Sequence, residues 1–290
     1  MADSRQIQWF PGHMAKTKRE LQESIKLVDL AVEILDARIP FSSSNPDLNA
    51  IISRKARIVI LNKSDLADDV QSKKWINFYK NKNIKAIPFS AKSGQGVALF
   101  VSAIHNVLKE KINAWKSKGI IGWNAKIMVV GIPNVGKSLF INRLAGKSKA
   151  KVENRPGVTR KNQWFSVDKN ISLLDTPGVL WPKFEDKTVA QNLAFTGAIK
   201  DEILDTEELV VKFLDSVKMN YADKIVERYK IELKELVEQN GYELLEAIGK
   251  KRGMLISGGE IDTERTASMI LDEFRSGRLG RITLEVPCNN

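Results

Sequence analysis

The sequence contains one cysteine, Cys288, in 290 residues, so it cannot form a disulfide within the chain. A single thiol fits a reducing compartment, and we expect the protein to be cytoplasmic. No stretch reaches the roughly 20 apolar residues of a membrane-spanning helix, because Lys126 interrupts the nearest candidate within 120–135. The N-terminal segment also lacks the apolar core of a secretory signal. These absences exclude a disulfide-stapled secreted protein and an integral membrane protein.

Acidic residues are the scarcer charged class, with 35 Asp/Glu against 46 Lys/Arg, a net charge of +11. The excess is regional, since residues 1–205 hold 33 basic and 19 acidic residues, whereas residues 206–290 hold 13 and 16. Segment 147–161 alone has six basic residues and one acidic residue. This distribution favours contact with a nucleic acid over a merely solvated surface. In the acidic region, the best candidates for a local contact are Lys250, Lys251 and Arg252.

Short β-branched runs alternate with helical stretches as far as about residue 205, a pattern typical of a doubly wound, parallel α/β sheet. The expected parallel strands are 30–35, 57–61, 84–89, 126–130 and 171–174, with an antiparallel edge strand at 162–168. The expected helices of this part are 14–26, 71–80, 97–115 and 138–145. Beyond it the pattern becomes helical, at 206–217, 233–248 and 262–275. We therefore predict an α/β domain over 1–205 and an α-helical domain over 206–290.

The glycine-rich segment GIPNVGKS (131–138) follows a predicted strand and precedes a predicted helix. This is the context of a phosphate-binding loop, in which backbone N–H groups and a helix N-terminus face phosphates. Lys137 is expected on the β- and γ-phosphates and Ser138 on Mg²⁺. A chance glycine-rich turn is the alternative. The predicted nucleotide contacts here are Asn134, Val135, Gly136, Lys137, Ser138 and Leu139.

Two further segments have roles that suit the same phosphates. Asp175 ends a predicted strand in the tetrapeptide DTPG, where it can hold Mg²⁺ through water, and the amide of Gly178 can bond the γ-phosphate. Thr159 lies between the phosphate loop and Asp175, and a threonine in a mobile loop there can ligate Mg²⁺. The simpler explanations are an ordinary turn for DTPG and a β-turn threonine for Thr159.

Base recognition is predicted at the ends of two other strands, in NKSD (62–65) and SAK (90–92). The Asp65 carboxylate can accept hydrogen bonds from N1–H and the 2-amino group of guanine, so a buried Asp65 would strongly prefer guanine to adenine. A helix N-cap explains NKSD alone equally well. Five motifs with consistent roles together predict GTP and GDP as ligands and Mg²⁺ as cofactor. The predicted base contacts are Asn62, Lys63, Asp65, Ser90, Ala91 and Lys92.

These motifs resemble those of the translation-factor-related GTPases, except that the base motifs precede the phosphate loop, an order similar to that of the circularly permuted GTPases. Five flanking segments narrow the resemblance to the ribosome biogenesis GTPase A family over essentially the whole chain: WFPGHMAK (9–16), DARIP (36–40), LWPKFED (180–186), GAIKD (197–201) and KKRG…SGG (250–259). The resemblance implies a P-loop GTPase domain followed by a helical domain. It also implies GTP hydrolysis in late maturation of the large (50S) ribosomal subunit, with rRNA and ribosomal proteins as partners. We expect no membrane partner, and a monomer away from the ribosome.

The residue after Gly178 is Val179, at a position where many related GTPases carry a glutamine that orients the attacking water. An aliphatic side chain cannot do this, so intrinsic hydrolysis should be slow. The resemblance implies that His13 supplies the missing group, since a neutral imidazole can orient water or accept its proton. An RNA contact or a structural cap is the alternative for His13, and His105 is expected to be structural.

Asn134 resembles the potassium-coordinating asparagine of cation-activated GTPases, which implies K⁺ between the α- and γ-phosphates. A turn-forming asparagine after proline is an equally good explanation. Two other functions remain open. A metabolic P-loop enzyme such as a kinase is one, although the guanine motif at 62–65 argues against it. An RNA-binding scaffold that uses GTP only as a ligand is the other, and the missing glutamine is compatible with it.

Overall fold

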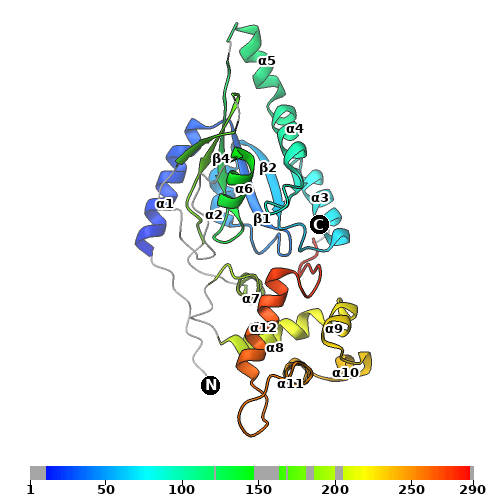
Figure 1. Ribbon diagram of the computed structural model, residues 1–290. Coiled ribbons are helices and arrows are strands. Elements are labelled where there is room, and N and C mark those ends of the chain that lie inside the picture. Colours follow the sequence, from blue (N-terminus) through cyan, green and yellow to red (C-terminus); the bar gives the residue numbers. More distant parts are fainter. Residues whose placement is uncertain are drawn as a thin grey trace.

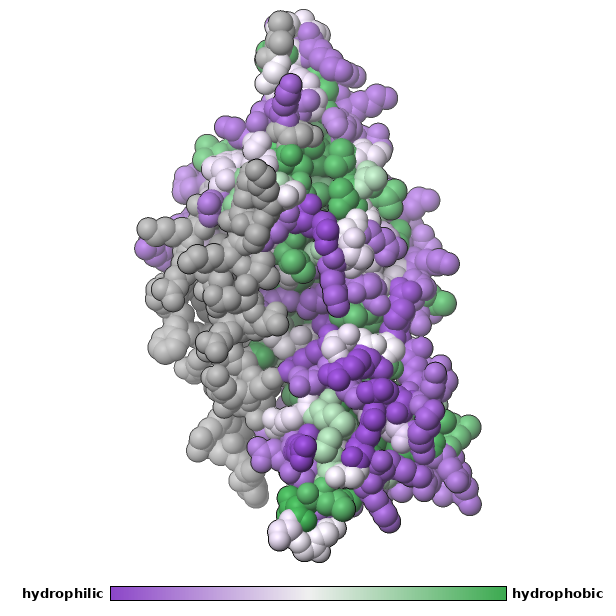
Figure 2. Space-filling view, in the orientation of Figure 1, coloured by the Kyte–Doolittle hydropathy of each residue, from purple (hydrophilic) through white to green (hydrophobic). Residues whose placement is uncertain are grey.

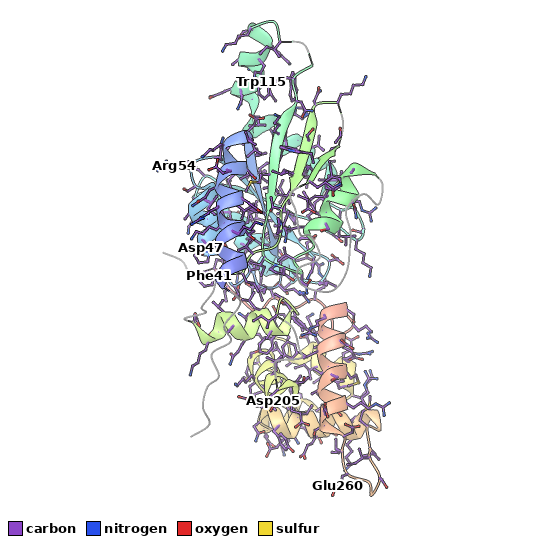
Figure 3. The ribbon with its side chains drawn as sticks, turned by 90° about the vertical axis from the view of Figure 1, so that its left-hand side faces the viewer. Phe41, Asp47, Arg54, Trp115, Asp205 and Glu260 are labelled. Carbon is purple, nitrogen blue, oxygen red and sulfur yellow. The ribbon has the colours of Figure 1, made fainter. Side chains whose placement is uncertain are left out.

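The computed structural model describes residues 11–120, 122–146, 163–167, 169–180, 186–199 and 205–287, with side chains from residue 16 onward. The described chain forms two lobes, an upper sheet lobe and a lower helical lobe (Figures 1 and 3). Trp115 lies near the upper tip and Glu260 at the lower tip (Figure 3). Within these ranges, none of the helices is both long enough and apolar enough to cross a bilayer.

The sheet lobe is built on a sheet that has six strands in the described part of the chain, in the order β3-β2-β1-β4-β6-β5. All neighbours run parallel except β5, which pairs antiparallel with β6 at the edge. The strands are β1 (Leu30–Asp36), β2 (Ala56–Asn62), β3 (Lys85–Pro88), β4 (Ala125–Val130), β5 (Gln163–Ser166) and β6 (Ile171–Asp175). The predicted parallel strands and the antiparallel edge strand are confirmed, with small differences at their ends.

Side chains of β1 alternate between the two faces of the sheet, and helices cover both faces. Val32 and Ile34 belong to one apolar cluster with Phe100 and Phe140. Ala31 points to the other face and belongs to a cluster with Leu21. All seven residues of β1 are therefore buried, as expected for a central parallel strand covered on both sides.

The helices of the sheet lobe include one that the sequence pattern does not predict, α2. It is seven residues long, begins with Pro46, and is capped by Asn45, whose side chain accepts a hydrogen bond from Asp47 N. The predicted helix 97–115 is two helices that meet at Leu108. The elements are α1 (Pro11–Ser24), the 3₁₀ turn η1 (Ile25–Leu27), α2 (Pro46–Ile52), α3 (Asp69–Asn81), α4 (Val97–Val107), α5 (Lys109–Ser117) and α6 (Lys137–Ala145).

Below the sheet lobe, α7 leads to the helical lobe. The core of this lobe includes Phe195, Phe213 and Phe274, and the Phe213 ring packs edge-on against Phe195 and tilted against Phe274. The predicted helix 233–248 is two helices, because the Asn240 side chain caps the second and Glu243 bonds back to Asn240 N. The division at residue 205/206 stays a prediction. The helices are α7 (Lys187–Phe195), α8 (Thr206–Val217), α9 (Ala222–Tyr229), α10 (Leu233–Glu238), α11 (Gly241–Arg252) and α12 (Thr263–Ser276).

Residues 278–287, here called the return segment, leave α12 and run back to the sheet lobe, so that they end beside α3 (Figure 1). Ile282 N donates to Leu66 O at 3.0 Å, and Leu284 N donates to Arg38 O at 2.8 Å. The sheet lobe is thus bonded to a segment that follows the last helix of the helical lobe.

Candidate nucleotide-binding site

The chain changes direction across the sheet at β1, which pairs with β2 on one side and with β4 on the other. In open α/β sheets, ligands bind outside the carboxyl ends of the strands at such a switch point. The loops that follow β2, β3, β4 and β6 contain the predicted motifs, and all begin at this edge. The topology therefore brings together sequence segments that lie between residues 62 and 180.

The loop between β4 and α6 has the backbone of the predicted phosphate loop. Gly136 has φ +92°, and a Cβ there would meet Asn62 Nδ2, so glycine is required. Lys137 Nζ curls back and donates to Ile132 O at 2.8 Å. Burial lowers the pKa of Lys137 to about 8, although the charge of Asp175 opposes the shift. The amine is thus held over its own loop, where a phosphate would attract it.

The loop after β6 lies directly against the phosphate loop. A Cβ at Gly178 would be 2.8 Å from both Lys137 Nζ and Pro133 N, so only glycine permits this approach. Ser138 Oγ lies 3.5 Å from Asp175 Oδ2. A hydroxyl and a carboxylate are oxygen donors that suit Mg²⁺, which binds through one or two protein groups plus phosphates. The residues present fit this ion, and the described side chains include no group of three or more His, Cys, Asp or Glu that could hold a metal.

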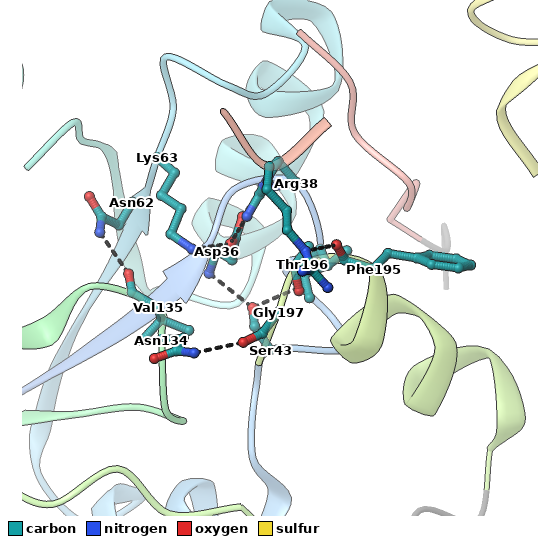
Figure 4. Close-up of polar contacts among 12 residues, drawn as sticks. Asp36, Arg38, Ser43, Asn62, Lys63, Asn134, Val135, Phe195, Thr196 and Gly197 are labelled. Atoms are coloured by element: carbon teal, nitrogen blue, oxygen red, sulfur yellow. Dashed lines mark hydrogen bonds and ion pairs between the residues drawn. The ribbon is translucent and has the colours of Figure 1, made fainter. Parts of the chain in front are cut away.

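Asn62, at the end of β2, joins three of the loops, and Figure 4 shows its bond to Val135. Its Nδ2 donates to Val135 O at 2.7 Å, and its Oδ1 accepts from Ala91 N at 3.1 Å. The side chain is buried, and both of its polar atoms bond the protein. Asn62 therefore fixes the predicted base loops against the predicted phosphate loop, and a direct contact from it to a base stays a prediction.

A buried ionic group lies beside these loops, centred on Asp36 at the end of β1 (Figure 4). Arg38 donates to the Asp36 carboxylate through Nε at 2.9 Å and Nη2 at 2.7 Å, and Lys63 Nζ lies 2.9 Å from Asp36 Oδ2. Although burial raises it, these two cations hold the pKa of Asp36 well below its usual range. Burial lowers the pKa of Lys63, and Asp36 opposes that shift. Sequence reasoning used DARIP only for the resemblance, yet an Asp at a strand end with an Arg two residues later is a detectable signal.

The base-recognition residues differ in exposure. Ser90 and Ala91 are buried, whereas Lys92 and Asp65 are exposed. The guanine contact of Asp65 stays a prediction, and the residue is exposed in this structure. Arg143 of α6, which the sequence reasoning missed, donates through Nε to Ala91 O at 2.9 Å and also bonds Lys92 O. The SAK segment is thereby held by the helix that follows the phosphate loop.

Asn134 connects the phosphate loop to the segment after α7. It has a left-handed backbone, φ +60°, and its Nδ2 donates to Gly197 O at 2.6 Å (Figure 4). Potassium coordination through the Asn134 oxygen stays a prediction. Leu139, in the first turn of α6, is 38% exposed.

Val179 is buried in the core of the sheet lobe. It is 8% exposed and belongs to an apolar cluster with Leu21 of α1 and Leu174 of β6. Its carbonyl accepts a hydrogen bond from Asn45 Nδ2 at 2.8 Å. The position after Gly178 is thus part of the core, as its aliphatic side chain predicts.

Two predicted residues fall outside the described parts, Thr159 entirely and His13 for its side chain. The backbone of His13 lies in the first turn of α1. The 14 residues of α1 span about 21 Å and the seven of β1 about 23 Å, and η1 joins them at the amino edge of the sheet. The first turn of α1 therefore lies near the carboxyl edge (Figure 1).

Known proteins resemble this chain over nearly its whole length. Residues 126–246 match a family model described as 50S ribosome-binding GTPase. "Ribosome biogenesis GTPase A" of Bacillus cereus is 48% identical over 97% of this chain and 94% of its own length. The protein of that name from Thermotoga maritima is 32% identical over 97% of this chain and 95% of its own length.

Solved structures agree with these relatives. The GDP-bound structure of TM YlqF has a TM-score of 0.66 and 29% identity over 93% of this chain and 99% of that one. GNP-bound YlqF from T. maritima has a TM-score of 0.64 and 28% identity over 95% of this chain and 100% of that one. The predicted fold, a P-loop GTPase domain with permuted motifs followed by helices, is confirmed. The chain therefore belongs to the ribosome biogenesis GTPase A family and is a ribosome biogenesis GTPase.

Proposed function

We propose that the chain binds GTP at the carboxyl edge of the sheet, and hydrolyses it on the immature large (50S) ribosomal subunit, whose late assembly it promotes. The observation that carries the nucleotide site is the bridging of Val135 and Ala91 by Asn62. Loops that are fixed to one another can hold the base and the phosphates of one nucleotide together. The family to which the chain belongs supports this role.

In the proposed complex, Asp65 accepts hydrogen bonds from N1–H and the 2-amino group of guanine, and the segment Ser90–Lys92 covers the other side of the base. Asp65 is exposed without a ligand. A base bound against this carboxylate would exclude water from it and strengthen its hydrogen bonds. Lys63, paired with Asp36, would support the loop beneath the base.

At the phosphate end, a bound γ-phosphate would replace the Ile132 carbonyl as partner of Lys137, because an ammonium binds a charged phosphate oxygen more strongly than a neutral carbonyl. The hydroxyls of Ser138 and Thr159, with Asp175 through water, would hold Mg²⁺. When bound, that ion neutralises charge on the β- and γ-phosphate oxygens. The Gly178 amide lies on the loop that packs against Lys137, where it can bond the γ-phosphate.

We assign the orientation of the attacking water to His13. The Val179 side chain belongs to the core and has no hydrogen-bonding group, whereas α1 brings its first turn to the carboxyl edge. A positioned imidazole that accepts a proton typically contributes about 10²- to 10⁴-fold to the rate. Because His13 need not touch GTP before the reaction, its loss should affect turnover and not affinity.

A K⁺ ion beside Asn134 is part of the same proposal. The two polar atoms of a carboxamide act separately, so the nitrogen can donate to Gly197 while the oxygen faces a cation. Turnover in K⁺ should then exceed turnover in Na⁺, and an Asn134→Ala variant should lose that difference. Equal turnover of the unchanged protein in the two salts would remove K⁺ from the mechanism.

The ribosomal partner is inferred from charge as well as from family. Residues 1–205 carry the basic excess, which suits the rRNA backbone. In the helical lobe, Lys250, Lys251 and Arg252 end α11. The loop between α11 and α12 follows them, and Figure 2 shows apolar side chains at its tip, where Leu255 and Ile256 are exposed. A basic helix end beside an apolar tip can contact both rRNA and ribosomal proteins.

The test compares His13→Ala with the unchanged protein in phosphate release, with and without purified 50S subunits. We expect slow release by the free protein, stimulation by subunits, and a stimulated kcat roughly 10²-fold lower in the variant with unchanged GTP affinity. His105→Ala is the matched control, because it removes the only other histidine in the chain, an exposed side chain near Trp123. Loss of subunit binding with residual hydrolysis intact would make His13 an RNA contact. No release under any condition would favour the scaffold that only binds GTP.

A further inference from the structure

The return segment contacts the loop that carries Asp65, and Arg281 makes the most contacts with it. Arg281 Nη2 donates to Ser64 O at 2.8 Å, and its Nε donates to Ala67 O at 2.7 Å. The guanidinium also pairs with Asp69, at the start of α3. One side chain thus holds two backbone carbonyls on either side of Asp65.

The backbone of the return segment adds a third contact. Ile282 N donates to Leu66 O at 3.0 Å, so the carbonyls immediately before and after Asp65 are both held. Gly277, which ends α12, lies so close that a Cβ there would be 2.6 Å from Leu66 Cδ2. The loop is therefore packed against the C-cap of α12 as well as bonded to the return segment.

Within the loop, one of the two backbone hydrogen bonds is longer than these external ones. Ala67 N reaches Ser64 O at 3.4 Å, and Lys63 has a left-handed backbone with φ +58°. Non-glycine residues adopt that conformation only where their surroundings enforce it. Leu66 N does bond Lys63 O at 2.9 Å, which closes one turn but does not fix the direction of Asp65.

The return segment is itself fixed to the helical lobe. Tyr221 OH donates to Thr283 O at 2.9 Å and accepts from Thr283 N at 3.0 Å. Thr283 Oγ1 accepts from Asp68 N at 3.0 Å, at the end of the Asp65 loop. A continuous set of hydrogen bonds therefore runs from Tyr221, the N-cap of α9, through the return segment to the Asp65 loop.

We infer that Arg281 is a positioning residue for guanine recognition: by holding the carbonyls of Ser64 and Ala67, it sets the position of the Asp65 carboxylate at the carboxyl edge of the sheet. The inference rests on the proposed guanine contact of Asp65. It extends that contact by making base selectivity depend on a residue that follows the last helix of the helical lobe.

The test is the affinity of Arg281→Ala for GTP and ITP, measured by fluorescence titration or calorimetry. Inosine lacks the 2-amino group of guanine, so the ratio of the two dissociation constants reports the Asp65 contact. We expect GTP to bind roughly tenfold more weakly while ITP changes less, so that the preference for GTP shrinks. Arg281→Lys should restore part of the preference, because an ammonium can still donate to a loop carbonyl. Arg278→Ala is the matched control, since this exposed arginine contacts Ser276 Oγ and not the loop.

The outcomes separate this inference from the proposed function. If the unchanged protein binds GTP and ATP equally, the guanine site itself is wrong. If the unchanged protein prefers GTP and Arg281→Ala keeps the same ratio of ITP to GTP affinity, the inference is wrong, even where the variant melts at a lower temperature. A lower melting temperature with an unchanged ratio means that Arg281 only stabilises the fold.

Discussion

The two lobes differ in how many charged side chains they bury. At the carboxyl edge of the sheet lobe, Asp36, Arg38, Lys137 and Asp175 are all buried. In the described part of the helical lobe, Glu273 is the only buried charged side chain, and it pairs with arginines at the rim of the core. A buried charge lowers stability unless it is paired with an opposite charge or binds a ligand. The contrast indicates that the sheet lobe gives up stability for chemistry, whereas the helical lobe is built mainly for shape.

The largest effect should follow from Phe274→Ala, which removes a core ring at the junction of the lobes. Phe274 is 1% exposed, its ring lies 4.7 Å from that of Phe213, and Arg38 Cζ lies 5.0 Å from its centroid. We expect the free energy of unfolding to fall by about 3–5 kcal/mol. Urea unfolding should show one transition by fluorescence and by circular dichroism. Two separated transitions would mean that the lobes unfold independently. Phe140→Ala is the matched variant, because it removes a buried ring within the sheet lobe.

Lys137→Ala should lower activity without lowering the stability of the ligand-free protein. We expect kcat for GTP to fall roughly 10²- to 10³-fold, the scale of a lost electrostatic donor. The ligand-free protein should be no less stable, because burial disfavours the charged amine that the variant removes. The measurements are single-turnover hydrolysis and thermal unfolding without nucleotide. Lys212→Ala, on the surface of α8, should change neither, and a clear loss of stability in Lys137→Ala would contradict the contrast between the lobes.

Asp65→Asn should change which base is bound. A lost charge-assisted pair of hydrogen bonds should weaken GTP binding by about 1.5–3 kcal/mol, while xanthine nucleotides should bind better because their 2-oxo group accepts from an amide. Competition titrations with GTP, XTP and ATP measure this. The exposed Asp223→Asn in the helical lobe is the control. An Asp65→Asn variant that still prefers GTP to XTP would show that another residue reads the base.

The pH dependence of GTP binding should report Lys137. Its pKa is lowered to about 8 by burial, and a bound phosphate would raise it again. Binding therefore takes up a proton above pH 8, so affinity should fall as the pH rises through 8, by up to about tenfold per pH unit, and be flat below about pH 7. Calorimetry in buffers of different ionisation enthalpy measures the number of protons that are taken up when GTP binds. Lys137→Arg stays charged, so any fall that persists in that variant belongs to another group.

The smallest effect should come from the helical lobe's basic helix end. Replacing Lys250, Lys251 and Arg252 with glutamine should weaken 50S binding only a few-fold and make it less dependent on salt, because each phosphate contact contributes about one unit or less to the salt slope. Sedimentation at two salt concentrations measures this. Replacing Lys230 and Lys234 instead is the control for charge alone. An equal loss from both sets would mean that no local contact exists at α11.

The strands and the clustering of the motifs could be predicted from the sequence, because buried parallel strands are short β-branched runs and their carboxyl ends share one edge. The short helices α2, α7 and α9 are not predicted. Helices this short depend largely on tertiary packing, and α6, which is equally short, is predicted because the phosphate loop marks its start. The role of Asn62 as a bridge also lies beyond sequence reasoning. Its two partners become neighbours only when three loops meet.

Arg281 is the clearest case of a contact without a local signal. It is separated from Ser64 by 217 residues, and nothing in the surrounding RLGRITLE distinguishes it from a surface arginine. Only the path of the return segment brings it to the Asp65 loop. Sequence motifs predict the residues that contact a ligand, whereas the residues that support them can be found only from the structure.

The return segment also has a consequence for the order in which this protein matures during translation. Residues 62–65 leave the ribosome well before Arg281 is added, and at about 5–20 residues per second the 217 residues between Ser64 and Arg281 take roughly 10–40 s. For that time the nascent chain has the Asp65 loop but not the side chain that holds it. Under the proposed role of Arg281, the nascent chain would discriminate guanine poorly until residue 281 has been added, so nucleotide selectivity would be acquired late in synthesis.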